Sequence, residues 1–207
     1  MISPTLLVLL GTLGTAQATD YFFRFVGGNT VTNGQRLRFN VSFPIISPGV
    51  TPAPYNPDDH FARIYNNASV SPSTLYVVPT NPHPPPVPGY YGLSGAEGVP
   101  DAYRLIQSYH PSDEGTPFLY QDWKLEPSCS GNGTVLLRYG KDPHGEKRWI
   151  AVKETTNSGV EKWVPWYVKP TAANIANLTA WDYDIADLEL VVTTGQVASN
   201  APGGVIE

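Results

Sequence analysis

Residues 35–43 read Gln-Arg-Leu-Arg-Phe-Asn-Val-Ser-Phe, and this stretch indicates the fold class most directly. Every second residue from Leu37 to Phe43 is apolar, while the residues between them are polar. A period of two residues is typical of a strand that has one face buried and the other in solvent. The stretch therefore predicts a half-buried strand with Asn40 on its solvent face.

Further strands are predicted on both sides of this one. An earlier strand at 20–26 is joined to it through turn residues at 27–29 and 33–34. On the C-terminal side we predict strands at 61–65, 75–78, 118–125, 134–139, 148–153 and 161–168, and either a strand pair or one long bent strand at 181–192. The last few of these are separated by short turn sequences, which indicates an antiparallel meander.

The strand at 148–153 allows a prediction for each face. Ile150 and Val152 are expected on one side of the sheet, and Trp149 and Ala151 on the other, because successive side chains alternate along a strand.

Other segments are less regular. Pro165 interrupts the strand at 161–168, which suits a sheet edge or a bulge because proline lacks a backbone N–H donor. Residues 170–178 are the best helix candidate, and 102–109 fits either a strand or a short helix. Gly92-Leu93-Ser94-Gly95-Ala96 matches only part of the serine hydrolase motif and is interpreted as a flexible turn.

Together these segments predict a mainly β fold with at most one or two short helices. The chain contains 21 Pro and 19 Gly among 207 residues, which suits a domain rich in turns rather than a helical bundle. The preferred architecture is a single antiparallel β-sandwich, and the alternatives are a β-trefoil or a small β-barrel.

The N-terminus predicts an export signal at residues 1–18. An apolar run at 6–13 is followed by Ala16-Gln17-Ala18, the pattern of small residues that signal peptidase reads. We therefore expect a secreted, extracellular protein with a single β domain at 19–193 and a flexible C-terminal tail at 194–207. No later segment is predicted to span a membrane, since a spanning helix needs about 20 apolar residues.

Two further sequence features, the glycosylation sequons and the single cysteine, are interpreted for a secreted protein. N-glycosylation is predicted at the asparagines of four Asn-x-Ser/Thr sequons, which are Asn40, Asn67, Asn132 and Asn177. The single cysteine, Cys129, excludes an internal disulfide. We interpret Cys129 as a small buried residue, with an intermolecular bridge or a reactive thiol as alternatives.

Charge and residue spacing argue against several classes of function. The net charge of −5 and the lack of a Lys/Arg stripe argue against a nucleic-acid partner. The four histidines lack the close spacing of a metal site, so neither a metal nor another cofactor is predicted. Copper-dependent polysaccharide oxygenases use an N-terminal histidine, whereas the expected mature chain begins at Thr19.

Only weak catalytic candidates remain. Asp182 and Asp184 alternate with aromatic residues and are predicted to share one strand face. The pair fits a glycosidase acid pair or a calcium site, but the solvent face of a strand is the preferred interpretation.

Aromatic residues give the more informative pattern. The chain has five Trp and twelve Tyr. Carbohydrate-binding proteins place aromatic rings against the apolar faces of sugars. The candidate binding residues are those that gather toward the C-terminus, namely Trp163, Trp166, Tyr167, Trp181 and Tyr183.

The short leader, the opening strand, the sequons and the aromatic-rich hairpins at 134–168 resemble small secreted β-sandwich proteins of filamentous fungi, a largely uncharacterised group. The resemblance implies no particular activity. The first hypothesis is a non-enzymatic extracellular or cell-wall-associated glycoprotein that binds carbohydrate or another cell surface through exposed aromatics. The alternatives are an enzyme acting on a glycan or small molecule in a β-sheet cavity, and a structural coat protein or secreted effector.

Overall fold

The computed structural model describes residues 19–39, 47–52, 60–67, 71–77, 89–96, 99–108, 118–129, 134–142, 145–155, 159–171 and 182–193. Several predictions lie outside these residues and stay predictions. They concern the leader at 1–18, the tail at 194–207, most of the helix at 170–178, Trp181, and the sequons at Asn40, Asn132 and Asn177.

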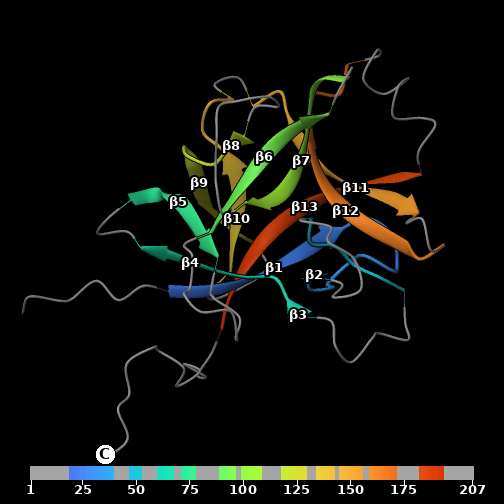
Figure 1. Ribbon diagram of the computed structural model, residues 1–207, viewed down its shortest axis with the longest axis horizontal. Coiled ribbons are helices and arrows are strands. Elements are labelled where there is room, and N and C mark those ends of the chain that lie inside the picture. The colour runs from blue at the N-terminus through green and yellow to red at the C-terminus, as the bar shows by residue number, and fades with distance from the viewer. Residues whose placement is uncertain are drawn as a thin grey trace, which may run out of the picture.

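All regular elements of the described residues are strands (Figure 1). They are β1 (Thr19–Gly27), β2 (Arg38–Phe39), β3 (His60–Phe61), β4 (Arg63–Asn67), β5 (Ser71–Val77), β6 (Tyr90–Ala96), β7 (Val99–Ser108), β8 (Phe118–Leu119), β9 (Trp123–Pro127), β10 (Thr134–Tyr139), β11 (Arg148–Thr155), β12 (Glu161–Val168) and β13 (Tyr183–Val192). The prediction of a mainly β, antiparallel protein is confirmed.

Eight of these strands form a closed ring. Their order is β1-β4-β5-β6-β7-β12-β11-β13, and β13 pairs back onto β1 from Tyr21 opposite Val192 to Gly27 opposite Ala186. Strands β10 and β9 extend from β13, β8 pairs with β6, and β2 and β3 form a separate small sheet (Figure 1). This pairing corresponds to the small barrel given above as an alternative, and it lends no support to a sandwich of two separate sheets.

Alternation along the strands fills the interior of the ring. Each ring strand contributes side chains to one buried cluster, which includes Phe23 and Phe25 of β1, Leu188 and Leu190 of β13, and Trp149 of β11. Because these residues come from every part of the ring and touch one another, the interior is a packed core.

A second buried cluster lies on the outer face of β7, β11 and β12. It contains Ile150, Val152 and Trp166, whereas Trp149 and Ala151 belong to the interior cluster. The predicted assignment of residues 149–152 to two opposite faces is therefore confirmed.

Pro165 lies inside the ring rather than at a terminal edge, since β12 pairs with β11 on one side and β7 on the other. On the β7 side, however, the ladder begins only at Trp166, and Trp163 instead exchanges two backbone hydrogen bonds with Val50. The nitrogen of Pro165 points the same way as that of Trp163, because orientation repeats every second residue. It therefore faces the gap between these two partners, where a missing donor costs little.

The strand predicted at 35–43 is described only up to Phe39, and only its residues 38–39 are in a strand. Its predicted alternation holds there, since Leu37 is fully buried and Arg36 is exposed. For the segment predicted at 102–109 as either a strand or a short helix, the described residues 102–108 lie in strand β7. The predicted turn at 92–96 was wrong, because these residues continue β6 and pair with β7.

Candidate functional site

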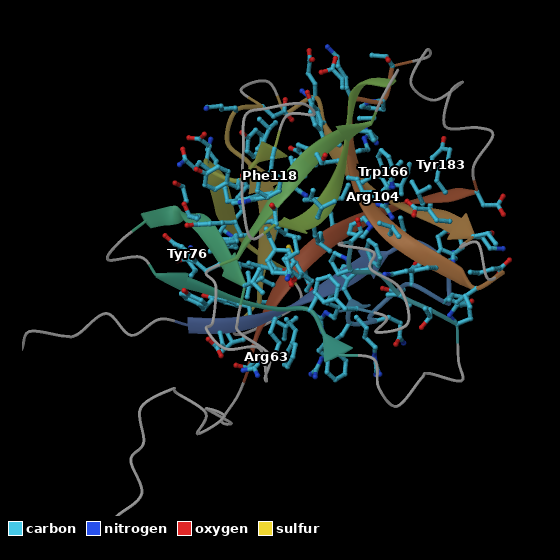
Figure 2. All side chains as sticks on the ribbon, in the orientation of Figure 1. Arg63, Tyr76, Arg104, Phe118, Trp166 and Tyr183 are labelled. Carbon is cyan, nitrogen blue, oxygen red and sulfur yellow. The ribbon has the colours of Figure 1, made fainter. Side chains whose placement is uncertain are left out.

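Four tyrosines line up on the outer face of the barrel. Tyr65 of β4 lies directly opposite Tyr76 of β5, which in turn lies opposite Tyr90 of β6. Tyr120 follows β8, which pairs with β6. These four residues are partly exposed, and we call them the tyrosine row. Tyr76 lies on the outside of the barrel in Figure 2.

The rings of the tyrosine row contact one another in sequence. Ring centroids are 5.0 Å apart between Tyr65 and Tyr76, 5.5 Å between Tyr76 and Tyr90, and 5.1 Å between Tyr90 and Tyr120. The first pair is nearly parallel, with 16° between ring planes, and the later pairs are tilted by 45° and 57°. Such offset and tilted arrangements are the favourable ones for aromatic pairs, so each ring holds its neighbour in place.

Phe118 extends the tyrosine row by one more ring. It stacks on Tyr120 with centroids 5.6 Å apart and lies over Gly92 of β6. A Cβ atom at residue 92 would be 2.5 Å from Cε2 and 2.6 Å from Cζ of Phe118, which is closer than atoms can approach. The glycine therefore allows Phe118 to lie on the sheet.

The phenol groups of Tyr65 and Tyr76 keep their protons at neutral pH. Burial raises the pKa of Tyr65, and the neighbouring Tyr76, Tyr90 and Asp20 raise it further. Burial also raises the pKa of Tyr76, together with the neighbouring Tyr90 and Tyr120. Each protonated hydroxyl can both donate and accept a hydrogen bond, so the surface combines apolar rings with polar tips.

The aromatic residues of β12 that were proposed from the sequence as exposed binding residues are buried. Trp163, Trp166 and Tyr167 are only 8%, 5% and 2% exposed. Trp163 and Tyr167 pack in the interior cluster, and the indole of Trp166 lies in the outer cluster, where its N–H donates to Glu154. The prediction that they present open faces to a ligand is corrected, because β12 has buried side chains on both faces.

The other two aromatic binding candidates, Tyr183 and Trp181, do not change this result. Tyr183 is partly buried and packs against the outer cluster, and Trp181 lies outside the described residues. Among the four sequons, only Asn67 is described, as the last residue of β4. Cys129 is exposed rather than buried, which corrects its interpretation as a packed residue.

The two acidic candidates each contact a different partner. Asp182 is exposed, and its carboxylate lies 3.9 Å from the ammonium of Lys153. Asp184 accepts a hydrogen bond from the side-chain amide of Asn29. Neither contact brings a second carboxylate to the aspartate, as a glycosidase acid pair requires. A catalytic role for either residue stays a prediction.

A polar groove lies where the sheet forks beside β13. The N-terminal part of β13 pairs with β11, and its C-terminal part pairs with β10 on the same side, so these two strands diverge between Ile185 and Glu189. The groove has a volume of about 570 Å³, and charged residues of both signs line it. These charged residues are Lys124, Arg138, Lys147, Arg148, Glu126, Asp142 and Asp187.

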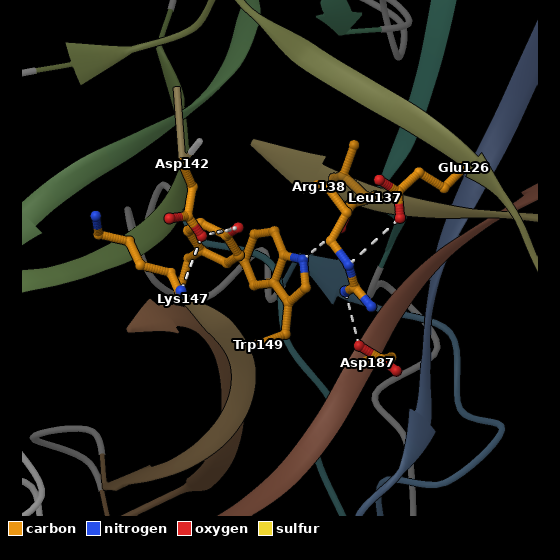
Figure 3. Close-up of polar contacts among 8 residues, drawn as sticks. Glu126, Leu137, Arg138, Asp142, Lys147, Trp149 and Asp187 are labelled. Carbon is orange, nitrogen blue, oxygen red and sulfur yellow. Dashed lines mark hydrogen bonds and ion pairs between the residues drawn. The ribbon is translucent and has the colours of Figure 1, made fainter. Parts of the chain in front are cut away.

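Ion pairs and hydrogen bonds hold the groove in shape (Figure 3). Arg138 lies 2.7 Å from the carboxylate of Asp187 and 3.9 Å from that of Glu126. The hydroxyl of Tyr167 donates to Asp142 over 3.2 Å, and the backbone N–H of Lys147 donates to the same carboxylate over 2.8 Å. The groove could therefore hold a small polar molecule.

Comparison with known proteins gives no match to a protein-family model, to a curated protein or to a solved structure. In the part of the chain that the structure describes, no group of three or more His, Cys, Asp and Glu is placed to hold a metal ion. The described residues also include no helix that is long and apolar enough to cross a membrane.

Proposed function

We propose that this protein is a secreted, non-enzymatic carbohydrate-binding protein and that the tyrosine row is its binding surface. The observation that carries the proposal is the strand register, which sets Tyr65, Tyr76 and Tyr90 opposite one another on three adjacent strands. Partly exposed aromatic side chains in regular order are unusual on a surface that has no partner.

The chemistry of tyrosine supports a sugar as the ligand. A pyranose has apolar C–H groups that pack against an aromatic ring, and hydroxyl groups that hydrogen-bond to the phenol oxygen. Tyrosine also has few rotatable bonds, and its ring contacts restrict them further, so little entropy is lost on binding. The row thus provides an ordered surface with both kinds of contact.

The shape of the row favours a linear polymer over a folded partner. On one side of the row, the next outward positions of β4 and β5 are Arg63 and Thr74 rather than further rings. A stable protein partner usually covers about 800 Å² on each side, which needs a broad surface rather than a narrow strip. A polysaccharide chain running along the row would contact each ring in turn.

The proposal is tested by depletion of the purified protein from solution with insoluble chitin, β-glucan, cellulose and mannan in parallel. The test variant is Tyr76→Ala, which removes the ring that contacts both Tyr65 and Tyr90. Truncating a central tyrosine of a binding surface costs about 2 kcal/mol, so we expect roughly 30-fold weaker binding to the polymer that the wild-type protein selects.

Tyr183→Ala is the matched control. Tyr183 is also partly exposed and packs on an apolar cluster, but it lies away from the row beside β11 and β12. We expect this variant to bind as the wild type does. Equal losses in both variants, or binding to none of the four polymers, would refute the proposed function.

The groove at the fork of β10 and β11 favours a second function, the binding or conversion of a small polar molecule. Its charged lining and its volume of about 570 Å³ are the supporting observations. Asp187→Asn tests this alternative, since it removes a charge from the groove and leaves the tyrosine row intact. Loss of sugar binding in this variant, with Tyr76→Ala unaffected, would move the proposed site to the groove.

A further inference from the structure

Three arginines surround one pair of phenylalanines on the outer face beside the tyrosine row. The guanidinium carbon of Arg36 lies 4.7 Å from the ring centroid of Phe22 and 5.6 Å from that of Phe61. The corresponding distance is 4.3 Å from Arg38 to Phe61 and 5.8 Å from Arg63 to Phe22. We call Arg36, Arg38 and Arg63, with the two rings, the arginine patch.

Segments that are distant in sequence build this patch. Phe22 of β1 lies opposite Arg63 of β4, and Arg38 of β2 lies opposite Phe61 of β3. The two rings meet edge to face, with centroids 5.3 Å apart. A cation–π contact with a ring orients each guanidinium and, at the exposed Arg36, leaves N–H donors at the edge of the group for other partners.

The charge of the patch contrasts with the rest of the molecule. The chain has 18 acidic residues against 13 Lys and Arg, yet three arginines gather here. Asp20 lies 2.9 Å from Arg63 and offsets part of that charge. Arg36 is exposed and has no carboxylate partner among the described residues. Its position therefore attracts an anionic group from solution.

The arginine patch is continuous with the tyrosine row. Arg63 and Tyr65 are two residues apart on β4, so their side chains leave the sheet on the same face. Asp20 of β1 lies opposite Tyr65, and Phe22 lies opposite Arg63. Figure 2 shows Arg63 on the outside of the barrel, as it does Tyr76. One ligand could therefore contact both the phenol rings and the guanidinium groups.

We infer that the polysaccharide bound by this protein is anionic and that its acidic groups bind the arginine patch while its sugar rings lie along the tyrosine row. This inference rests on the proposed function and adds the chemical class of the ligand. Carboxylate and sulfate groups both fit, since the guanidinium fork can donate two parallel hydrogen bonds to either. A neutral glycan would leave the charge of Arg36 without an ionic partner among the described residues.

The experiment measures the affinity of the full chain for two soluble acidic polymers, polygalacturonate for carboxylates and heparin for sulfates, with dextran and mannan as neutral polymers. The test variants are Arg36→Gln and the double variant Arg36→Gln/Arg38→Gln. We expect the wild type to prefer an acidic polymer, with weaker binding as salt increases. The double variant should bind at least tenfold more weakly.

Lys141→Gln is the control for a general effect of charge. Lys141 is 69% exposed, pairs with Asp122 and follows β10, a strand that pairs with neither β1 nor β4. This variant should bind the acidic polymer as the wild type does. Arg36→Lys should restore only part of the lost affinity, because lysine keeps the charge and loses the planar fork. Thermal unfolding of each variant confirms that it is folded.

The outcomes separate this inference from the function on which it rests. If a neutral polymer binds, depends on Tyr76 and ignores the arginine substitutions, the function holds and the inference is overturned. If no polymer binds, both are overturned. An equal loss in Lys141→Gln, or preferential binding to vesicles of anionic lipid, would also overturn it, since either result shows that charge alone or a membrane surface is recognised.

Discussion

The ion pair between Arg24 and Glu189 offers a direct test of how the barrel closes. Arg24 of β1 lies opposite Glu189 of β13, and Nη2 of the arginine is 2.6 Å from Oε2 of the glutamate. The side chain of Glu189 is fully buried, and that of Arg24 is 25% exposed. Ser128 also donates a hydrogen bond to Glu189. The change considered is Arg24→Met, which removes the cation and keeps a side chain of similar length.

The distance and burial of this pair give the expected loss of unfolding free energy in Arg24→Met. At 2.6 Å and an effective dielectric constant of about 20, the attraction between the two charges is about 6 kcal/mol, and the cost of removing both from water offsets much of it. Removing one partner of a buried pair typically costs about 3–5 kcal/mol, because the other charge stays buried. Water can reach the partly exposed Arg24, so we expect a value near the lower end, about 3 kcal/mol.

Urea unfolding at neutral pH measures this cost. With a denaturant dependence of about 2–3 kcal/mol per molar urea, the midpoint should fall by about 1–1.5 M. Arg104→Met is a matched control, since Arg104 lies at the same 2.6 Å from Glu154, whose side chain is 26% exposed. A pair in which water reaches both side chains contributes about 1 kcal/mol or less, so this midpoint should change little.

The double variant Arg24→Met/Glu189→Leu decides between two explanations of any loss. If the cost comes from a buried charge left without its cation, replacing both residues by apolar ones should recover most of the stability. The reasoning is refuted if the single variants at residues 24 and 104 lose equal stability, or if the double variant is no more stable than Arg24→Met.

Two further predictions concern packing and pH. Gly92→Ala places a methyl group against Phe118 and should lower the unfolding free energy by about 1–3 kcal/mol. The double variant Gly92→Ala/Phe118→Leu should recover the lost stability. An unchanged melting temperature in Gly92→Ala would contradict the contact. Burial and the nearby Asp142 raise the pKa of Tyr167 well above its ordinary value of 10.0, so above pH 10 the unfolded chain loses this proton while the folded protein keeps it. Stability should therefore fall as pH rises beyond 10, and urea unfolding from pH 9 to 11 should show a smaller fall in Tyr167→Phe; an equal fall in both proteins would contradict this assignment.

The local alternation of side chains could be predicted from the sequence because it depends on neighbouring residues alone. The two faces of residues 149–152 were assigned correctly, since a strand turns each successive side chain to the opposite side. The same reasoning identified most of the strands. It could not identify the pairing of Arg24 with Glu189, because these residues are far apart in the chain and no local pattern specifies which strands become neighbours. The closed ring was therefore available only as an alternative.

The prediction that Trp163, Trp166 and Tyr167 are exposed was wrong for a reason that the sequence itself contains. Residues 163–168 read Trp-Val-Pro-Trp-Tyr-Val, a continuous apolar run without alternation. Such a run is typical of a strand buried on both faces, and β12 lies between two ring strands with both faces covered. The concentration of aromatic residues in one segment indicated a core strand in this case. The partly exposed aromatic rings lie on other strands.

The tyrosine row shows where such rings are found. Tyr65, Tyr76 and Tyr90 each lie directly beside a fully buried residue, namely Ile64, Leu75 and Tyr91 respectively, so alternation alone places their side chains outside. Their alignment, however, depends on the register of two strand pairs, and a slip of one residue in β5 would turn Tyr76 into the core. A linear binding surface on a sheet is thus made by residues that are regular across strands and scattered along the chain. Such a surface would be found by aligning neighbouring strands in register and looking for aromatic residues at matching outward positions. A search for aromatic clusters along the sequence would miss it.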